Sequence, residues 1–217
     1  MELVKGPAEQ RVLLRNASWE TYERLISERE ERPVPRFFYD RGVLEIVSPS
    51  KVHESISRVV ALLVEELAVE LDVDIESAGS TTFKREDLAR GFEPDECFYF
   101  QNVEHVRGKH NIDLNVDPPP DLVVEVDVTS YSLDKLPIYA SLGISEVWRY
   151  ADRQLQILGL RDQDYEAIIE STVLPPLTSH VLSRFVEEGL QTRRPAWVRR
   201  VRQWARSQAT RPESDGG

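Results

Sequence analysis

The sequence contains one cysteine and no long apolar run, and each shortage excludes a class of protein. Cys97 has no second cysteine with which to form an intramolecular disulfide or a cysteine-based zinc site. No apolar segment approaches the roughly 20 residues that span a bilayer. Residues 1–10 also lack the apolar stretch and the cleavage site of a secretory signal. We therefore expect a cytoplasmic protein that does not bind membranes.

Positive charge is also scarce, which argues against a broad nucleic-acid surface. The 217 residues carry a net charge of −11, whereas phosphate binding draws on clustered lysine and arginine. The exception is 193–217, where seven arginines against Glu213 and Asp215 give a local charge of +5 and leave −16 for the first 192 residues. With 41% apolar residues, the chain can form one sizeable core. We predict a single domain over residues 1–192, followed by a basic tail.

Helical and strand patterns alternate along the chain, which predicts one α/β domain with a mixed central β-sheet flanked by helices. Near the N-terminus, Ser18 can cap a helix that starts at Trp19, and a β-hairpin at 36–39 and 43–47 follows. Apolar residues recur at helical spacing over 56–71, so this segment is predicted to be the longest core helix. Further strands are predicted within 72–83, from Asp95 onward, and at 121–128, 145–150, 153–160 and 165–171, further helices at 136–142 and 183–189, and loops at 84–91 and 101–117.

The basic tail can form an amphipathic helix. Its apolar face would contain Trp197, Val201 and Ala205, with arginines mainly on the other side. Such a helix could dock on the acidic body of its own domain, bind a second subunit, or approach DNA or an anionic surface. We expect docking or homodimer formation first.

Carboxylates are concentrated on the strand predicted at 121–128. Side chains alternate along a strand, so Asp121, Glu125 and Asp127 share one face. Burying charges of one sign is costly, and a bound divalent cation would compensate for that cost, which favours a metal site. The alternative is that Asp121 caps the start of the strand, Asp127 is exposed at its end, and Glu125 pairs with a core lysine or arginine.

A neighbouring strand can bring a further carboxylate to the same place. Asp95, like Asp121, follows a proline and precedes strand-forming residues. The two strands could therefore present carboxylates at one sheet edge, although aspartate after proline is also common in turns. At the start of the long helix, helical geometry turns His53 toward the sheet and Glu54 away from it.

Taken in order, these segments resemble the Uma2 family, from about Ser18 to Gly189. The segments and residues that carry the resemblance are HES at 53–55, GSTTFKREDLARGFEPDECFYF at 79–100, PPPDLVVEVDVTS at 118–130, Lys135, Tyr139, Gly143 and EVW at 146–148. The resemblance implies a restriction-endonuclease-like core of the PD-(D/E)XK superfamily. The usual reaction of that superfamily is Mg²⁺-dependent hydrolysis of DNA phosphodiesters.

The resemblance also implies roles for individual residues. Asp95 would be the aspartate of the first motif and Glu125 the acidic residue of the (D/E)XK strand. Both would hold Mg²⁺ or Mn²⁺, with Asp127 as a further ligand. The pattern departs from the family at Asp127, which stands where the motif lysine is expected. Lys135, at the start of the following helix, would then supply the lysine function beside the phosphate.

Residues around this set could support the site. His53 or Glu54 could add a contact near the metal, because many superfamily members carry an acidic residue at this point of the first helix. Lys84, Arg85 and Arg90 could contact phosphates, or could instead belong to a solvated loop in which they pair with nearby carboxylates.

Three functions remain open at this point. The first is an endonuclease acting on nucleic acid, with DNA expected before RNA. The second is a catalytically silent nuclease fold that binds or regulates, which Asp127 and the charge of −11 favour. The third is a homo-oligomeric assembly protein that acts through its sheet edge and its C-terminal helix.

Overall fold

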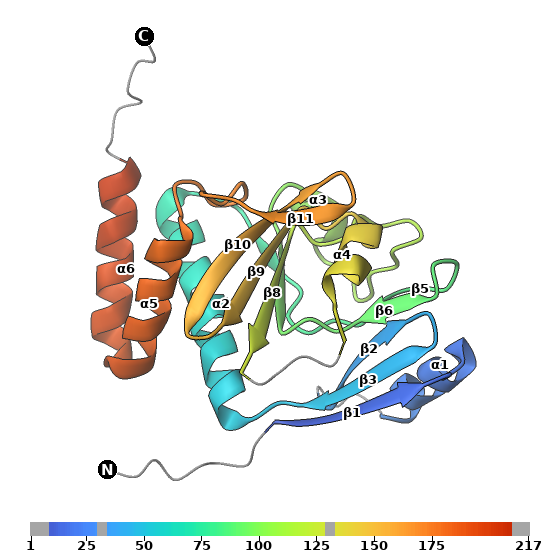
Figure 1. Ribbon diagram of the computed structural model, residues 1–217. Coiled ribbons are helices and arrows are strands. Elements are labelled where there is room, and N and C mark those ends of the chain that lie inside the picture. Colours follow the sequence, from blue (N-terminus) through green and yellow to red (C-terminus); the bar gives the residue numbers. More distant parts are fainter. Residues whose placement is uncertain (1–8, 30–33, 129–132, 210–217) are drawn as a thin grey trace, which may run out of the picture.

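The fold is built from two β-sheets with helices packed around them (Figure 1). The computed structural model describes residues 9–29, 34–128 and 133–209. A six-stranded sheet runs through the middle of the molecule, and a five-stranded sheet formed by earlier parts of the chain lies next to it. This arrangement confirms the α/β class, the mixed sheet and the flanking helices predicted from the sequence.

The six-stranded sheet is mixed because β8 and β9 run parallel, whereas its other neighbouring strands are antiparallel. The predicted strand at 72–83 is shorter than expected, since only a two-residue strand and the first residue of another fall within it. In spatial order the strands are β11 (Asp164–Ala167), β10 (Gln154–Arg161), β9 (Glu146–Ala151), β8 (Leu122–Asp127), β7 (Glu96–Tyr99) and β4 (Glu76–Ser77).

Strand β8 lies inside this sheet and is buried along its whole length. Leu122, Val124 and Val126 pack into the apolar core beneath helix α2 (Lys51–Leu71). Val123 packs on the opposite face, in the core beneath helix α4 (Leu136–Leu142). A strand covered on both faces usually consists almost entirely of apolar residues. In β8, carboxylates interrupt the apolar residues.

The five-stranded sheet is larger than the predicted N-terminal hairpin. The hairpin itself is present as β2 (Arg36–Asp40) and β3 (Val43–Ser48). Strand β1 (Gln10–Arg15), which the sequence did not indicate, extends the sheet beyond β3. On the other side, a second hairpin of β5 (Phe83–Arg85) and β6 (Arg90–Phe92) joins β2 through β6. All neighbouring strands of this sheet are antiparallel.

The prediction of a loop at 84–91 is therefore wrong. Its polar residues lie between Phe83 and Phe92, which are register partners and fully buried. Their rings stack with centroids 5.1 Å apart. Cross-strand aromatic pairing of this kind stabilises a hairpin, and it outweighs the preference of the intervening polar residues for a loop.

The ends of two helices follow the predicted capping residues. Ser18 caps α1 (Trp19–Glu28) by accepting a backbone hydrogen bond within the first turn. Helix α4 (Leu136–Leu142) ends at Gly143, which has a φ of +76°. The region predicted as a loop at 101–117 includes one short helix, α3 (Val103–Val106). Among the described helices, none combines the length and apolar character needed to cross a membrane.

The basic tail docks on its own domain. Helices α5 (Ser179–Gln191), longer than predicted, and α6 (Arg194–Ala209) pack beside α2, away from the five-stranded sheet (Figure 1). The side chains of Trp197, Val201 and Ala205 on α6 are fully buried. The structure thus shows the first of the three positions considered for this helix.

Opposite charges add to this docking. Arg202 pairs with Glu66 at 2.5 Å, and Arg206 pairs with Glu70 at 2.7 Å. Both carboxylates belong to α2. Part of the positive charge of the tail is therefore engaged inside the molecule.

Replacing Trp197 by alanine should lower the free energy of unfolding by about 3–5 kcal/mol, as large aromatic deletions in a core do. The Trp197 indole also donates a hydrogen bond to the carbonyl of Phe185 at 2.8 Å. Urea unfolding followed by circular dichroism measures the change. Arg199→Ala, on the exposed side of α6, is the control and should change the value by less than about 0.5 kcal/mol. Equal effects of the two substitutions would contradict docking through the apolar face.

Candidate active site

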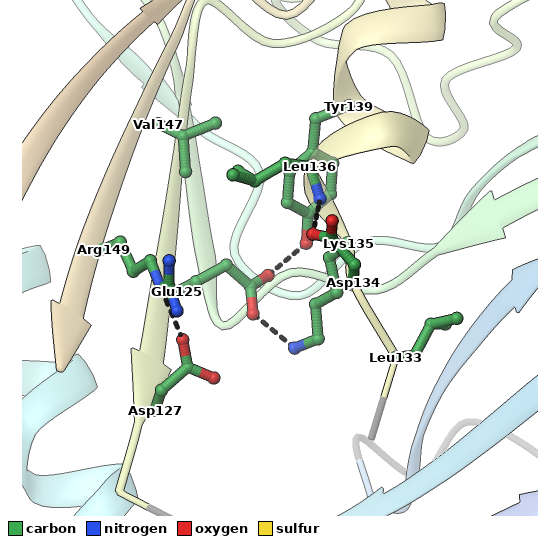
Figure 2. Close-up of a pocket in the computed structure, with 9 residues that line it drawn as sticks. All are labelled: Glu125, Asp127, Leu133, Asp134, Lys135, Leu136, Tyr139, Val147 and Arg149. Atoms are coloured by element: carbon green, nitrogen blue, oxygen red, sulfur yellow. Dashed lines mark hydrogen bonds and ion pairs between the residues drawn. The ribbon is translucent and has the colours of Figure 1, made fainter. Parts of the chain in front are cut away.

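A cavity of about 340 Å³ lies between β8 and α4, on the side of the sheet opposite to α2 (Figure 2). Glu125 of β8 faces it, because residues alternate along the strand and its neighbour Val124 faces α2. The residues that line the cavity are Glu125, Asp127, Leu133, Asp134, Lys135, Leu136, Tyr139, Val147 and Arg149.

Glu125 is buried and bound on both of its oxygens. Tyr139 donates its hydroxyl hydrogen bond to Oε1, and Lys135 forms an ion pair with Oε2 (Figure 2). Burial, together with the nearby charges of Asp95 and Asp127, raises the pKa of Glu125 to about 7 against the opposing effect of Lys135. The carboxylate therefore lies where additional positive charge would stabilise it.

Lys135 is the residue that joins α4 to both sheets. It stands at the position just before the helix, and its ammonium lies 3.6 Å from the ring centroid of Phe38 on β2. Burial lowers the pKa of Lys135, but the charges of Glu125, Asp95 and Asp127 raise it more, so the net shift is upward. Lys135 is therefore a cation at neutral pH, held beside the cavity.

Asp95 lies just before β7, level with Glu125 across the antiparallel pair of strands. Its Oδ2 accepts a hydrogen bond from the backbone nitrogen of Val126 at 2.6 Å and lies 3.1 Å from His53 Nε2. Its Oδ1 pairs with Arg36 of β2. Burial raises the pKa of Asp95, but His53 and Arg36 lower it more, to about 2. The structure thus brings Asp95 and Glu125 to neighbouring strands, as expected.

Asp127 and Asp121 have different surroundings at the two ends of β8. Asp127 is buried, which contradicts the alternative of an exposed residue, and its Oδ2 accepts a hydrogen bond from Arg149 at 3.2 Å. Asp121 accepts hydrogen bonds from the backbone nitrogens of 100–102. As the alternative interpretation expected, Asp121 thus has a structural role at the start of the strand.

The first turn of α2 contributes His53 to the buried site. His53 is almost fully buried against Asp95, which confirms that it faces the sheet. Glu54 is half exposed, and it accepts a hydrogen bond from Arg36 at 3.0 Å. Arg36 therefore links Glu54 to Asp95.

The three basic residues of the second hairpin have partners elsewhere. Lys84 pairs with Glu23 at 2.7 Å, and Arg85 pairs with Asp87 at 2.6 Å. Arg90 is buried, pairs with Asp40 at 2.8 Å and donates to a backbone carbonyl of α4. They do not line the cavity, so a phosphate contact by any of them stays a prediction without geometric support.

The chemistry of these donors fits a divalent cation. Carboxylate oxygens are the ligands that Mg²⁺ and Mn²⁺ prefer, and each ionised carboxylate has about four acceptor positions, more than Asp95 and Glu125 use. Oδ1 of Asp127 is buried and accepts no hydrogen bond from the described residues. Within that same part of the chain, no group of three His, Cys, Asp or Glu side chains is arranged to hold a metal ion. Arg36 pairs with Asp95, and Lys135 pairs with Glu125.

Several residues that contact the carboxylates were not predicted from the sequence. Arg36 and Arg149 reach Asp95 and Asp127 from other strands, and Tyr139 was noted only as part of a family pattern. An arginine at the start of an otherwise aromatic strand, as in RFFY, was the available signal for Arg36.

Replacing Arg36 by methionine should lower the free energy of unfolding by about 3–5 kcal/mol, because Asp95 would remain buried without its main cation. Thermal or urea unfolding checks this value. The control is Arg24→Met, which removes an exposed pair with Glu28 and should cost at most about 1 kcal/mol. A loss for Arg36→Met no larger than that of the control would show that Asp95 does not depend on this arginine.

The chain is similar to known proteins in its sequence and in its fold. The sequence profile of the Uma2 family, described as "Putative restriction endonuclease", matches residues 19–196. One similar solved structure is described as "a putative nuclease belonging to DUF820 from Anabaena variabilis ATCC 29413"; it is 14% identical, with 70% of this chain and 92% of that chain covered at a TM-score of 0.50. No curated protein matches the sequence. The structural likeness shows a shared nuclease-type fold, and the profile match over most of the chain shows that the protein belongs to the Uma2 family.

Proposed function

We propose that this protein is a metal-dependent endonuclease that hydrolyses phosphodiester bonds in nucleic acid, with DNA as the expected substrate. One observation carries the proposal: Asp95, Glu125 and Lys135 gather around one strand beside a cavity. Acidic side chains next to a lysine are suited to holding a metal ion and to stabilising charge on a phosphate.

The family and the fold support the same reaction class. The Uma2 family is described as "Putative restriction endonuclease", and the structural neighbour is described as "a putative nuclease". Both descriptions agree with a nuclease-like role for this chain. The metal requirement and the choice of DNA are the proposal's own additions.

The metal would be Mg²⁺ or Mn²⁺, held by Asp95 and Glu125, with Oδ1 of Asp127 as a further donor. A divalent cation bound there supplies Lewis-acid stabilisation of a phosphate oxygen and lowers the pKa of the attacking water. Positive charge from the cation would also compensate for the burial of Glu125, whose pKa is raised to about 7.

Lys135 would act on the phosphate directly. Its ammonium has three donors, so it can remain paired with Glu125 and also donate to a phosphate oxygen in the cavity. Because Lys135 is a cation, its role would be to neutralise charge that develops on the phosphate. Tyr139 holds Glu125 in place, and His53 holds Asp95.

A catalytically silent module is the second candidate. Asp127 stands in place of the motif lysine, and no three-ligand group for a metal is preassembled among the described residues. Such a protein would keep the fold and bind nucleic acid without turnover. The experiment below separates the two.

The purified protein should cleave plasmid or single-stranded DNA with Mg²⁺ or Mn²⁺ and should not cleave it with EDTA. Asp95→Ala, Glu125→Gln and Lys135→Ala should each reduce the rate by about 10²–10³-fold or more, since each removes a metal ligand or the phosphate-stabilising cation. Gel assays of cleavage measure the rates, and circular dichroism checks that each variant is folded.

Lys109→Ala is the control for Lys135→Ala, because Lys109 pairs with Asp117 outside the cavity and its loss should leave the rate unchanged. Cleavage by Asp95→Ala at the wild-type rate would point to a contaminating nuclease and remove the proposal. If no nucleic acid is cut by the wild-type protein, the silent module replaces the enzyme.

A further inference from the structure

Position 127 holds an anion where the (D/E)XK pattern has a lysine, and the structure surrounds this anion with arginines. Oδ2 of Asp127 accepts a hydrogen bond from Arg149 Nε at 3.2 Å. From the other sheet, a terminal nitrogen of Arg11 lies 3.9 Å from Oδ1. Arg11 is itself paired with Glu9 at 2.6 Å and with Glu45 at 3.3 Å, so its charge is already balanced. Arg149 is the cation that bonds Asp127 from the strand beside Glu125.

Arg149 lies directly beside Glu125. The two residues are register partners on the parallel strands β8 and β9, so their side chains leave the same face of the sheet. Figure 2 shows Arg149 on one side of Glu125 and Lys135 on the other. A phosphate bound in the cavity would therefore meet a cation on each side of the carboxylate.

Arg149 also faces a second, larger hollow. This hollow has a volume of about 1120 Å³, and both Asp127 and Arg149 line it as well as the cavity. Because Asp127 and Arg149 line both spaces, a strand bound in the cavity could continue into this hollow. The guanidinium of Arg149 stands where the two spaces adjoin, and its side chain is 26% exposed.

Arg11 has a different position. It comes from β1, which precedes the residues 19–196 matched by the family profile. Arg11 pairs with the fully buried Glu45 at 3.3 Å and lines neither space. Its contacts therefore hold Asp127 from the side of the five-stranded sheet and do not reach into the cavity.

We propose that Arg149 binds a phosphate of the nucleic-acid strand adjoining the cleaved bond, and that Asp127 and Arg11 position it. The inference rests on the proposed function for the identity of its ligand. A guanidinium has five N–H donors in a planar fork, so Arg149 can bond Asp127 and a phosphate together. Arg149 would bring positive charge close to the position of the motif lysine, while Lys135 serves the cleaved phosphate.

Binding measured without cleavage tests this inference. Fluorescence anisotropy with a labelled single-stranded 20-nucleotide DNA in EDTA, repeated with RNA of the same sequence, gives Kd over a series of salt concentrations. Arg149→Met should weaken binding by roughly tenfold or more, since a charge-assisted hydrogen bond is lost. It should also reduce the slope of log Kd against log salt by about 0.7, the value of one phosphate contact on a single strand. Arg149→Lys should keep the wild-type slope and should lose less affinity than Arg149→Met.

Arg11→Met tests the positioning role. It should weaken binding by a few-fold and leave the salt slope unchanged, because Arg11 would touch no phosphate. Arg15→Met is the matched control on the same strand, with an exposed side chain, and should change neither quantity. A fall in slope for Arg11→Met would overturn the positioning role, and an unchanged slope for Arg149→Met would overturn the phosphate contact.

The outcomes of this experiment separate the inference from the proposed function. If wild-type protein cuts nothing but Arg149→Met loses affinity and slope, the phosphate contact stands and the enzyme does not. If wild-type protein cuts DNA and Arg149→Met retains both affinity and slope, the enzyme stands and the contact is refuted.

Discussion

The burial of Glu125 is the constraint on which the surrounding structure depends. Its strand is covered on both faces, and a carboxylate taken out of water there must be matched by a cation or by hydrogen bonds. Lys135 and Tyr139 both come from the segment that leads into and forms α4, so the position of that helix is tied to the carboxylate. Lys135 also lies on the ring of Phe38, which ties the same group to the second sheet. One buried charge thus fixes how a helix and two sheets meet.

Much of this architecture follows from local sequence. The long helix is set by apolar residues at helical spacing, and capping residues such as Ser18 and Gly143 mark helix ends because their own geometry favours those positions. Asp95 and Glu125 could be placed near each other because each occurs within or just before a strand-forming run, and adjacent runs pair in the sheet. Periodicity and capping act over a few residues, which is why a single sequence reveals them.

The remainder depends on partners distant in the chain. Strand β1 leaves Val12 and Leu14 exposed and Arg11 half-buried, so its hydropathy does not mark a buried face, and it forms by pairing with β3. The hairpin of β5 and β6 depends on Phe83 meeting Phe92 in register, which outweighs the polar residues between them. Arg36 reaches Asp95 from the other sheet, so no spacing along the sequence announces it.

The arginines around Asp127 come from segments that lie far apart in the chain. Arg11 belongs to the first described strand, whereas Arg149 follows more than half of the chain later. During synthesis the N-terminal arginine emerges first and has no acidic partner from β8 for most of that time. Contacts between distant segments form late in folding, because their loop-closure entropy is large. A ribosome-bound fragment that ends before β9 therefore lacks Arg149 and cannot assemble the charged residues around Asp127.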